Sequence, residues 1–343
     1  MHKIYLLKFT YITNISNNLF FTLTRKRRDV TLDPSRTMKR GASGASIGGH
    51  ILLVTMKEIL DRAKKENYAV LAANFLCEVD ARAFLEAAED LNAPLILDMS
   101  YKNSMGIVFT GKYVCELCNM AKIPVALNLD HGREMTHFAS AVRAGFTSMM
   151  IDCSALPFEE NVETVKRVVA MAHSVGMSTE AELGHVGKGA EYDTCGSSFT
   201  DPSEAAEYVE RTNVDCLAVA IGTAHGAYKG TPFIDFDRLA AIREKVSVPL
   251  VIHGGSGTGV DNLYKVSRSG VSKININNDL ICGAYKQLIA SDMKGNGAYG
   301  MWNYLKNGFK ERAKEYIQLF GSDGKAWMPE PAGLEHRQLS LVE

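Results

Sequence analysis

The sequence predicts an α/β protein with eight strand and helix units followed by extra C-terminal helices. From Met56 onward, apolar runs of strand length alternate with amphipathic helical stretches. Because parallel strands need crossover helices, this order indicates a parallel sheet. Eight such units in a chain of 343 residues fit a closed (β/α)8 barrel, the TIM barrel, better than an open doubly wound sheet.

The first four units follow this pattern in order. Strands are predicted at residues 69–75, 94–99, 124–129 and 148–152, each a short apolar run. Helices are predicted at residues 78–91, 113–121, 134–144 and 157–174. Apolar residues recur on one face of the first of them, Gly145 ends the third, and Glu159 and Glu160 lie at the positive end of the fourth.

The remaining units continue the alternation. Strands are predicted at residues 179–183, 217–221, 249–252 and 271–276, and helices at residues 235–246 and 261–269. Another helix should begin at Asp201, since Pro202 suits a first helical position. The tail after Ala284 is helical in pattern, with an apolar stripe containing Trp302 and Phe309. We expect it to cap the barrel or to form a subunit contact.

Residues 184–200 are polar, rich in glycine and without periodicity. The stretch is long for a connection between a strand and a helix, which predicts a mobile lid.

The first 50 residues differ from the rest. Residues 1–28 contain no Asp or Glu but six Lys and Arg, and residues 41–49 are small. The segment is either a targeting segment or, as we favour, an appended or disordered extension with no fold of its own. Residues 51–343 are predicted to form a single domain.

Composition excludes several classes of protein. The 38 basic and 39 acidic residues balance, so no nucleic-acid surface is indicated. No apolar run approaches the ~18 residues of a membrane span. The seven cysteines are scattered and odd in number, which predicts a reducing compartment and a cytoplasmic location. Cys115 and Cys118 form a Cys-x-x-Cys that we interpret as small residues of a helix.

Polar residues collect at the predicted carboxyl ends of the strands, which converge at one face of a barrel. They are Asp130 and His131, Asp152, Glu182, His225, His253, Asn275 and Asn277. Three imidazoles meeting at one face are a ligand set of catalytic zinc, at about 2.0–2.1 Å per nitrogen. The glycine-rich stretches after His225 and His253 suit a phosphate, and Gly254, Gly255 and Ser256 follow strand seven, where barrels often bind one.

At this point the sequence resembles a known family, the class II, metal-dependent ketose-bisphosphate aldolases, from about Leu53 to the end. The markers are Met56-Lys-Glu-Ile-Leu60, Leu129-Asp-His-Gly132, Met150-Ile-Asp-Cys-Ser154, Ala181-Glu-Leu-Gly-His-Val-Gly187, Ala220-Ile-Gly-Thr-Ala-His-Gly226, His253-Gly-Gly-Ser-Gly257 and Lys273-Ile-Asn-Ile-Asn277. Together and in this order they are highly specific.

The resemblance implies a role for each matching residue. His131, His225 and His253 would bind zinc, with Glu182 an acidic position beside it, and Asp130 would be the acid/base. One substrate phosphate would be held by Gly226, Lys229, Gly254, Gly255 and Ser256. Other substrate contacts would come from Asn74, Ser100, Asn275 and Asn277.

The implied reaction is the reversible cleavage of a ketose 1,6-bisphosphate to dihydroxyacetone phosphate and glyceraldehyde 3-phosphate, a step of glycolysis. Zinc beside the ketose carbonyl would stabilise the carbanion as an enediolate, so no Schiff-base lysine is needed. Glu191 in the lid is our candidate for the base that moves a proton on carbon. Fructose bisphosphate is preferred, but tagatose bisphosphate, its C4 epimer, stays open. The resemblance also implies a homodimer or homotetramer, while the need for a monovalent cation is not determined.

Two other functions are weighed against this one. Metal-dependent hydrolases on the same barrel usually carry a His-x-His at the first strand, and residues 72–75 contain no histidine. A metal-free barrel that only binds sugar phosphates would contain no zinc.

Overall fold

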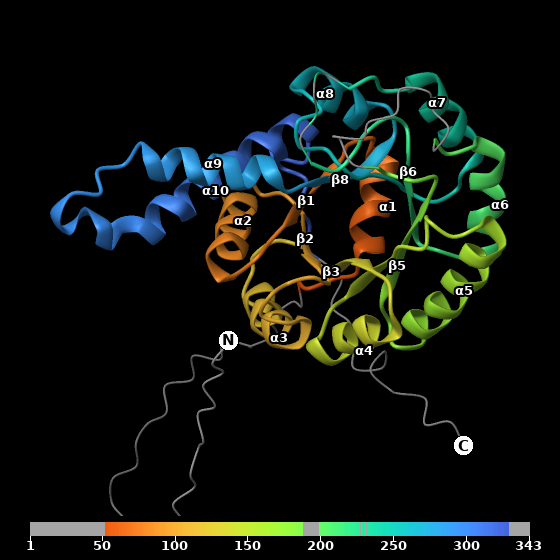
Figure 1. The fold of residues 1–343 in the computed structure, drawn as a ribbon, viewed down its shortest axis with the longest axis horizontal. Helices are drawn as coiled ribbons and strands as arrows, with labels where there is room; N and C mark the ends of the chain where they lie inside the picture. Colours follow the sequence, from red (N-terminus) through yellow and green to blue (C-terminus); the bar gives the residue numbers. More distant parts are fainter. Residues whose placement is uncertain (1–51, 188–198, 227, 229, 231, 329–343) are drawn as a thin grey trace, which may run out of the picture. The chain divides into compact units, whose positions relative to one another are not determined.

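The computed structural model describes residues 52–187, 199–226, 228, 230 and 232–328. In this part of the chain eight parallel strands close into a barrel in chain order (Figure 1). The strands are β1 (Val70–Asn74), β2 (Leu95–Ser100), β3 (Val125–Gly132), β4 (Ser148–Ile151), β5 (Ser178–Leu183), β6 (Cys216–Val219), β7 (Leu250–Ile252) and β8 (Val271–Ile276). The predicted (β/α)8 barrel is confirmed.

Helices surround the barrel and extend beyond it (Figure 1). They are α1 (Met56–Glu66), α2 (Glu78–Asp90), α3 (Ile107–Asn119), α4 (Met135–Ala144), α5 (Phe158–Ser174), α6 (Pro202–Thr212), α7 (Phe236–Lys245), α8 (Val260–Arg268), α9 (Asn278–Ile289), the 3₁₀ helix η2 (Gly295–Gly300) and α10 (Met301–Phe320). The predicted extension and single domain are not tested, because residues 1–50 lie outside the described residues.

Helix α1 was not predicted from the sequence. Its start is a capping box in which the Thr55 side chain accepts from the backbone N–H of Glu58, and Glu58 accepts from that of Thr55. The backbone N–H of Met56 also donates to Ser148 Oγ at 2.8 Å. The helix packs against the amino-terminal half of the barrel interior, so its apolar face is buried by strands distant in the sequence.

Other element boundaries also differ from the prediction. Helix α3 begins at Ile107, six residues before the predicted start at residue 113, because Gly106 with φ 84° sets the entry to the helix. Strand β6 ends at Val219, and residues 220–221 are not paired as a strand. Strand β3 continues to Gly132, past the predicted end at residue 129, since its last residues still pair with β4.

Two apolar clusters hold the fold together. The larger one lies between the strands and the surrounding helices and includes Phe84, Leu97 and Tyr208. The smaller one fills one end of the barrel, where Met56 and Leu60 of α1 pack against Ile96 and other strand residues. Among the described residues, this second cluster fills the amino-terminal end of the barrel, whereas the cavity with the polar side chains lies at the carboxyl end.

The barrel interior changes along the strands. On β2, Ile96, Asp98 and Ser100 share the inward face, because alternate residues of a strand point to the same side. Ile96 packs with α1, Asp98 is fully buried, and Ser100 lines a cavity at the carboxyl end. The interior is therefore apolar next to α1, buried and polar in the middle, and open at the carboxyl end.

The tail forms a projecting pair of helices, α9 and α10, joined through η2 (Figure 1). Its base packs on the barrel, where Phe309 contacts Phe84 edge to face at a centroid distance of 5.6 Å. Trp302, from the predicted stripe, is 59% exposed. The tail thus covers α2 only in part and leaves apolar side chains on its surface.

Two predictions about the class of protein can be compared with the structure. Among the described residues, none of the helices combines the length and the apolar character that crossing a bilayer requires. Six cysteines of this part of the chain are free thiols, and Cys115 and Cys118 lie in α3 as expected.

Candidate metal centre and active site

The last residues of β3 bring an aspartate and a histidine to the same cavity. The pairing between β3 and β4 shifts register between Leu129 and Gly132, and His131 has φ 52°. This irregularity breaks the alternation of the strand, so Asp130 and His131 both line the cavity. A non-glycine residue with positive φ is unusual and is often found at functional sites. The two side chains therefore reach one cavity through an irregularity within the strand.

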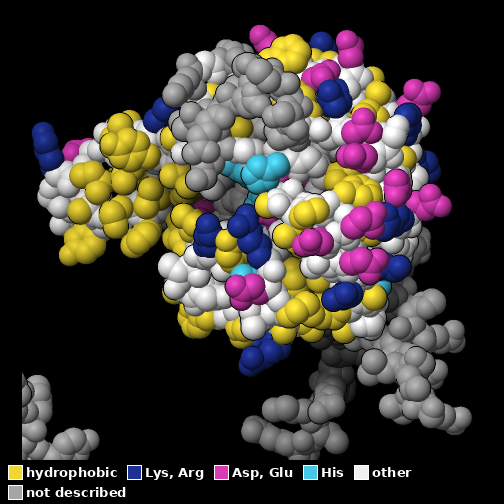
Figure 2. Space-filling model, turned by 45° about the vertical axis from the view of Figure 1, so that its right-hand side comes forward, with side chains coloured by type: hydrophobic (Ala, Val, Ile, Leu, Met, Phe, Trp, Pro, Cys, Tyr) yellow, Lys and Arg dark blue, Asp and Glu magenta, His cyan; other side chains and the backbone are white. Residues whose placement is uncertain are grey.

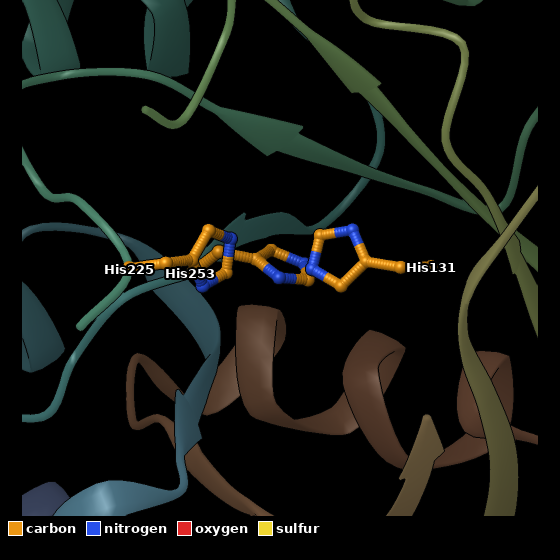
Figure 3. Close-up of side chains that lie close together, drawn as sticks. All are labelled: His131, His225 and His253. Atoms are coloured by element: carbon orange, nitrogen blue, oxygen red, sulfur yellow. The ribbon is translucent and has the colours of Figure 1, made fainter. Parts of the chain in front are cut away.

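Three imidazoles from different strands converge beside it. Figure 3 shows the rings of His131, His225 and His253 pointing toward one another. Their ring centroids are 4.7 Å apart for His131 and His253, 5.0 Å for His131 and His225, and 5.8 Å for His225 and His253. The candidate ligand atoms of the three residues all lie within 4.8 Å of one another. The predicted convergence is therefore present in the structure.

The unpaired ring nitrogens fit a metal ion. Nε2 of His131, Nε2 of His225 and Nδ1 of His253 are buried, and none has a hydrogen-bond partner among the described residues. A buried polar atom without a partner is costly, and a cation at the point where the three meet would satisfy all of them. Burial and the neighbouring imidazoles lower the pKa of His225 to about 3, which keeps that ring neutral, as a metal ligand must be.

A second candidate group shares His131. Its members are His131, Asp152 and Glu182. Asp152 Oδ2 lies 3.0 Å from His131 Nδ1 and accepts from Arg133 Nη2 at 2.9 Å. Burial alone would raise the pKa of Asp152, but its bonds to these neighbours outweigh burial and lower the pKa. Glu182 leaves Oε2 buried and unpartnered among the described residues. The structure thus places Glu182 beside the predicted metal ligands, next to Asp152.

Asp130 is held by two amides. Its Oδ2 accepts from Asn74 Nδ2 at 2.8 Å, and its Oδ1 accepts from Asn275 Nδ2 at 3.4 Å. Burial raises the pKa of Asp130, but the nearby His131, His253 and Lys273 lower it to about 2 overall. The carboxylate is therefore ionised at neutral pH and able to accept a proton.

A polar cluster lies under the histidines and was missed in the sequence. Lys273 Nζ is 3.2 Å from Asp98 Oδ2 and 2.9 Å from Glu180 Oε2, and all three side chains are fully buried. Burial raises the pKa of Asp98 to about 6 although Lys273 opposes the shift. A periodic signal could have found these residues, because each lies two positions before a predicted site residue on the same strand face: Ser100, Glu182 and Asn275.

The loop after β7 forms a cradle next to the start of α9. Ser256 Oγ accepts from the backbone N–H groups of Asn277 and Asp279 at 3.1 and 3.2 Å. Gly254 has φ 69°, and a Cβ there would overlap the backbone of Ala224. The close packing of this loop and the positive end of α9 suit an anion such as phosphate.

These parts face one cavity of about 710 Å³, a size typical of small-molecule sites. The predicted residues that line it are Asn74, Ser100, Asp130, His131, Glu182, His225, Gly226, Gly254, Gly255, Ser256, Asn275 and Asn277. His253 lies fully buried next to the other two histidines. The predicted positions Lys229 and Glu191, and most of the predicted lid, lie outside the described residues.

Other residues line the cavity without having been assigned a role in the sequence: Tyr101, Lys102, Arg133, Asp152 and His185. The half-exposed side chain of His185 has Nδ1 3.1 Å from Ser154 Oγ and lines the same cavity. Figure 2 shows histidine side chains within the hollow and Lys and Arg side chains beside it.

The comparisons with known proteins agree with this geometry. A family model described as fructose-bisphosphate aldolase class-II matches residues 54–325. The chain belongs to this family. The class II aldolase is therefore a carbon–carbon lyase by family, as the sequence predicted, and its metal-ligand groups agree with a metal-dependent enzyme.

Individual relatives cover the same region of this aldolase. It is 38% identical over 288 residues to the fructose-bisphosphate aldolase of Geobacillus stearothermophilus, and the aligned region covers 80% of this chain and 99% of that protein. It is 40% identical over 284 residues to the fructose-bisphosphate aldolase of Staphylococcus aureus strain Mu50, and the aligned region covers 80% of this chain and 99% of that protein. Both matches extend over nearly the whole length of the relative.

A solved structure also matches this aldolase. The crystal structure of the YdjI aldolase from Escherichia coli K12 has a TM-score of 0.73 and 33% identity, covering 80% of this chain and 100% of that one. The fructose-bisphosphate aldolase of Campylobacter jejuni, at 20% identity and a TM-score of 0.69, has the same fold.

Proposed function

We propose that this aldolase reversibly cleaves a ketose 1,6-bisphosphate, with fructose 1,6-bisphosphate preferred, to dihydroxyacetone phosphate and glyceraldehyde 3-phosphate. One observation carries the proposal most. Three buried imidazole nitrogens, which have no hydrogen-bond partner among the described residues, lie close together beside an ionised carboxylate. The names of the relatives support the choice of fructose bisphosphate and a role in glycolysis.

The metal in this proposal is zinc, held by His131, His225 and His253. Imidazole nitrogens suit zinc, and three of them leave a coordination position free for substrate. When bound, the metal would polarise the ketose carbonyl and stabilise negative charge that develops on its oxygen. Glu182 would lie beside this centre with Asp152.

Asp130 is the proposed acid/base of the reaction. In cleavage it would take the proton from the C4 hydroxyl, and in condensation it would return a proton to the aldehyde oxygen. The amides of Asn74 and Asn275 support this role because they hold its two oxygens. A carboxylate that is fixed and already ionised does not have to reorganise before it accepts the proton.

The remaining polar groups would bind the substrate. Gly254, Gly255 and Ser256 would hold one phosphate at the start of α9, with Gly226 beside them. Ser100, Asn74, Asn275 and Asn277 would contact the sugar chain. The proposed roles of Lys229 in phosphate binding and of Glu191 as the base that acts on carbon concern residues outside the described part of the chain.

Cleavage of the two epimeric bisphosphates tests the proposal. Purified protein should split fructose 1,6-bisphosphate with a higher kcat/KM than tagatose 1,6-bisphosphate in an assay coupled to reduction of dihydroxyacetone phosphate. A higher kcat/KM for the tagatose epimer would assign the enzyme to that sugar instead. Absence of cleavage with both epimers in zinc-loaded protein would reject the proposed reaction.

We also propose that the enzyme is a cytoplasmic homodimer or homotetramer. The tail supports a subunit contact, because Tyr285, Ile289, Met293, Tyr299 and Trp302 are exposed on or between α9 and α10. Figure 2 shows hydrophobic side chains gathered on this tail. Large apolar patches of this kind often mark protein interfaces. Light scattering after gel filtration should give two or four times the mass of the chain; a monomer would contradict the proposal.

A further inference from the structure

We propose that Glu180 and Lys273 are positioning residues that determine which ring nitrogen of His253 faces the metal. The inference rests on the proposed metal centre, since it describes how the protein prepares one ligand of that centre. Neither residue lines the cavity that the substrate would enter. Both act from beneath the site, through His253.

The first step is the bond between Glu180 and His253. Glu180 Oε1 lies 2.6 Å from His253 Nε2, and both side chains are fully buried. A carboxylate only accepts, so Nε2 of the ring must carry the proton. The other nitrogen, Nδ1, then has its lone pair free, and it is the atom of His253 that has no partner among the described residues. The hydrogen bond therefore selects the tautomer that a metal needs.

The second step is the lysine that holds the carboxylate. Glu180 Oε2 lies 2.9 Å from Lys273 Nζ, so the two oxygens of one carboxylate face two different donors. Lys273 has no exposed surface and lies between Glu180 and Asp98. An ionised carboxylate at this depth is stable only with a positive partner. The ammonium group fixes Glu180 both in charge and in orientation, and Lys273 itself does not line the cavity.

The third step joins the same lysine to the acid/base side. Asp98 Oδ2 accepts from Asn275 Nδ2 at 2.8 Å, and Asp98 Oδ1 accepts from Asn128 Nδ2 at 2.8 Å. Asn275 Nδ2 also reaches Asp130 at 3.4 Å. One buried ammonium thus connects the ligand His253 on one side with the amide that contacts Asp130 on the other. The cluster orients both parts of the site without touching substrate.

The substitution Glu180→Gln gives a sharp test. A glutamine has one acceptor, its carbonyl oxygen, and one donor group, its NH₂. Since the Lys273 ammonium can only donate, the carbonyl should turn to Lys273 and the NH₂ to His253 Nε2. His253 would then carry its proton on Nδ1, the atom that should face the metal. We expect zinc affinity to fall by roughly 10- to 100-fold, the usual effect of losing such a partner.

The experiment measures the tautomer directly. In metal-free protein labelled with ¹⁵N-histidine, long-range ¹H–¹⁵N spectra of neutral His253 should show a proton on Nε2 in the wild type and on Nδ1 in Glu180→Gln. Zinc affinity is measured by competition with a chelator. A proton on Nδ1 in the wild type would overturn the proposal, and that result needs no variant to fold. Unchanged zinc affinity in folded Glu180→Gln would overturn it too.

A matched control is available in the same strand region. Asp215 Oδ2 accepts from His173 Nε2 at 2.8 Å, another carboxylate and imidazole pair, and also from the Thr179 backbone N–H at 2.7 Å. Neither His173 nor Asp215 lines the cavity. Asp215→Asn should leave the His253 signal and zinc affinity unchanged. An equal loss of affinity in this control would contradict a specific role of Glu180. Because no sugar is present, the outcome is independent of whether the protein cleaves a ketose bisphosphate, which is measured separately.

Discussion

Replacing Asp130 by asparagine removes a charge and an acceptor without changing the shape of the side chain. In the structure both carboxylate oxygens face amide donors, Asn74 Nδ2 at 2.8 Å and Asn275 Nδ2 at 3.4 Å. An asparagine must turn its own NH₂ toward one of them, which costs about 1–3 kcal/mol of stability. It also removes the group that would take the C4 hydroxyl proton.

Loss of a positioned acid/base lowers turnover by about 10²–10⁴-fold. At 1.36 kcal/mol for each factor of ten, this is about 2.7–5.4 kcal/mol of transition-state free energy. We therefore expect kcat of Asp130→Asn to fall in this range in the coupled cleavage assay, while zinc content stays at the wild-type level. The three histidine ligands stay in place, although His131 loses the carboxylate oxygen that lies 3.9 Å from its Nε2.

The control is Asp201→Asn, the same substitution at the N-cap of α6, where the side chain accepts from the N–H groups of Ser203 and Glu204. Asparagine caps a helix about as well as aspartate, so activity and stability should remain near wild type. If Asp130→Asn keeps turnover within tenfold of the wild type with zinc bound, Asp130 is not the acid/base.

Three further predictions concern stability and the phosphate cradle. Burial raises the pKa of Asp98 to about 6, above the value of about 3.9 in the unfolded chain. The folded state therefore binds this proton more tightly than the unfolded state, and the stability that the proton contributes is lost as the pH rises from about 4 to 6. The free energy of unfolding of Asp98→Asn, measured with urea, should therefore rise by about 3 kcal/mol relative to that of the wild type between about pH 4 and 7. If the free energies of unfolding of the two proteins change in parallel with pH, the prediction is wrong. Gly254→Ala, whose Cβ would overlap Ala224, should lower kcat/KM on the order of 100-fold by displacing the cradle, and an unchanged value would mean that the loop does not position phosphate. Phe84→Ala removes a fully buried ring packed on Phe309 and should cost about 3–5 kcal/mol in thermal or urea unfolding; a loss below about 1 kcal/mol would contradict this packing.

Most of the barrel could be predicted because its strands are buried on both sides and are separated by amphipathic helices. Helix α1 could not, since its charged sequence shows few apolar residues and its packing depends on strands that lie far away in the chain. The end of β3 was predicted too early, because the polar residues Asp130 and His131 suggest a loop. The strand instead continues past them, and its pairing with β4 resumes at Gly132 after a register shift.

The site could be predicted in outline because a barrel brings strand ends together. The three histidines and Asp130 needed only their position after a strand. For Asp98, Glu180 and Lys273, the spacing of two residues from Ser100, Glu182 and Asn275 indicates the same strand face. Which of them pair with one another depends on how the strands are placed side by side.

The most direct test of the central claim is a titration of metal-free protein with zinc while cleavage of fructose 1,6-bisphosphate is followed. Activity should rise in proportion to bound zinc, and in His225→Ala both the tightly bound zinc and the activity should be lost. Full cleavage by protein shown to contain no metal, or wild-type zinc binding and activity in His225→Ala, would contradict the claim that these three imidazoles form the catalytic metal centre.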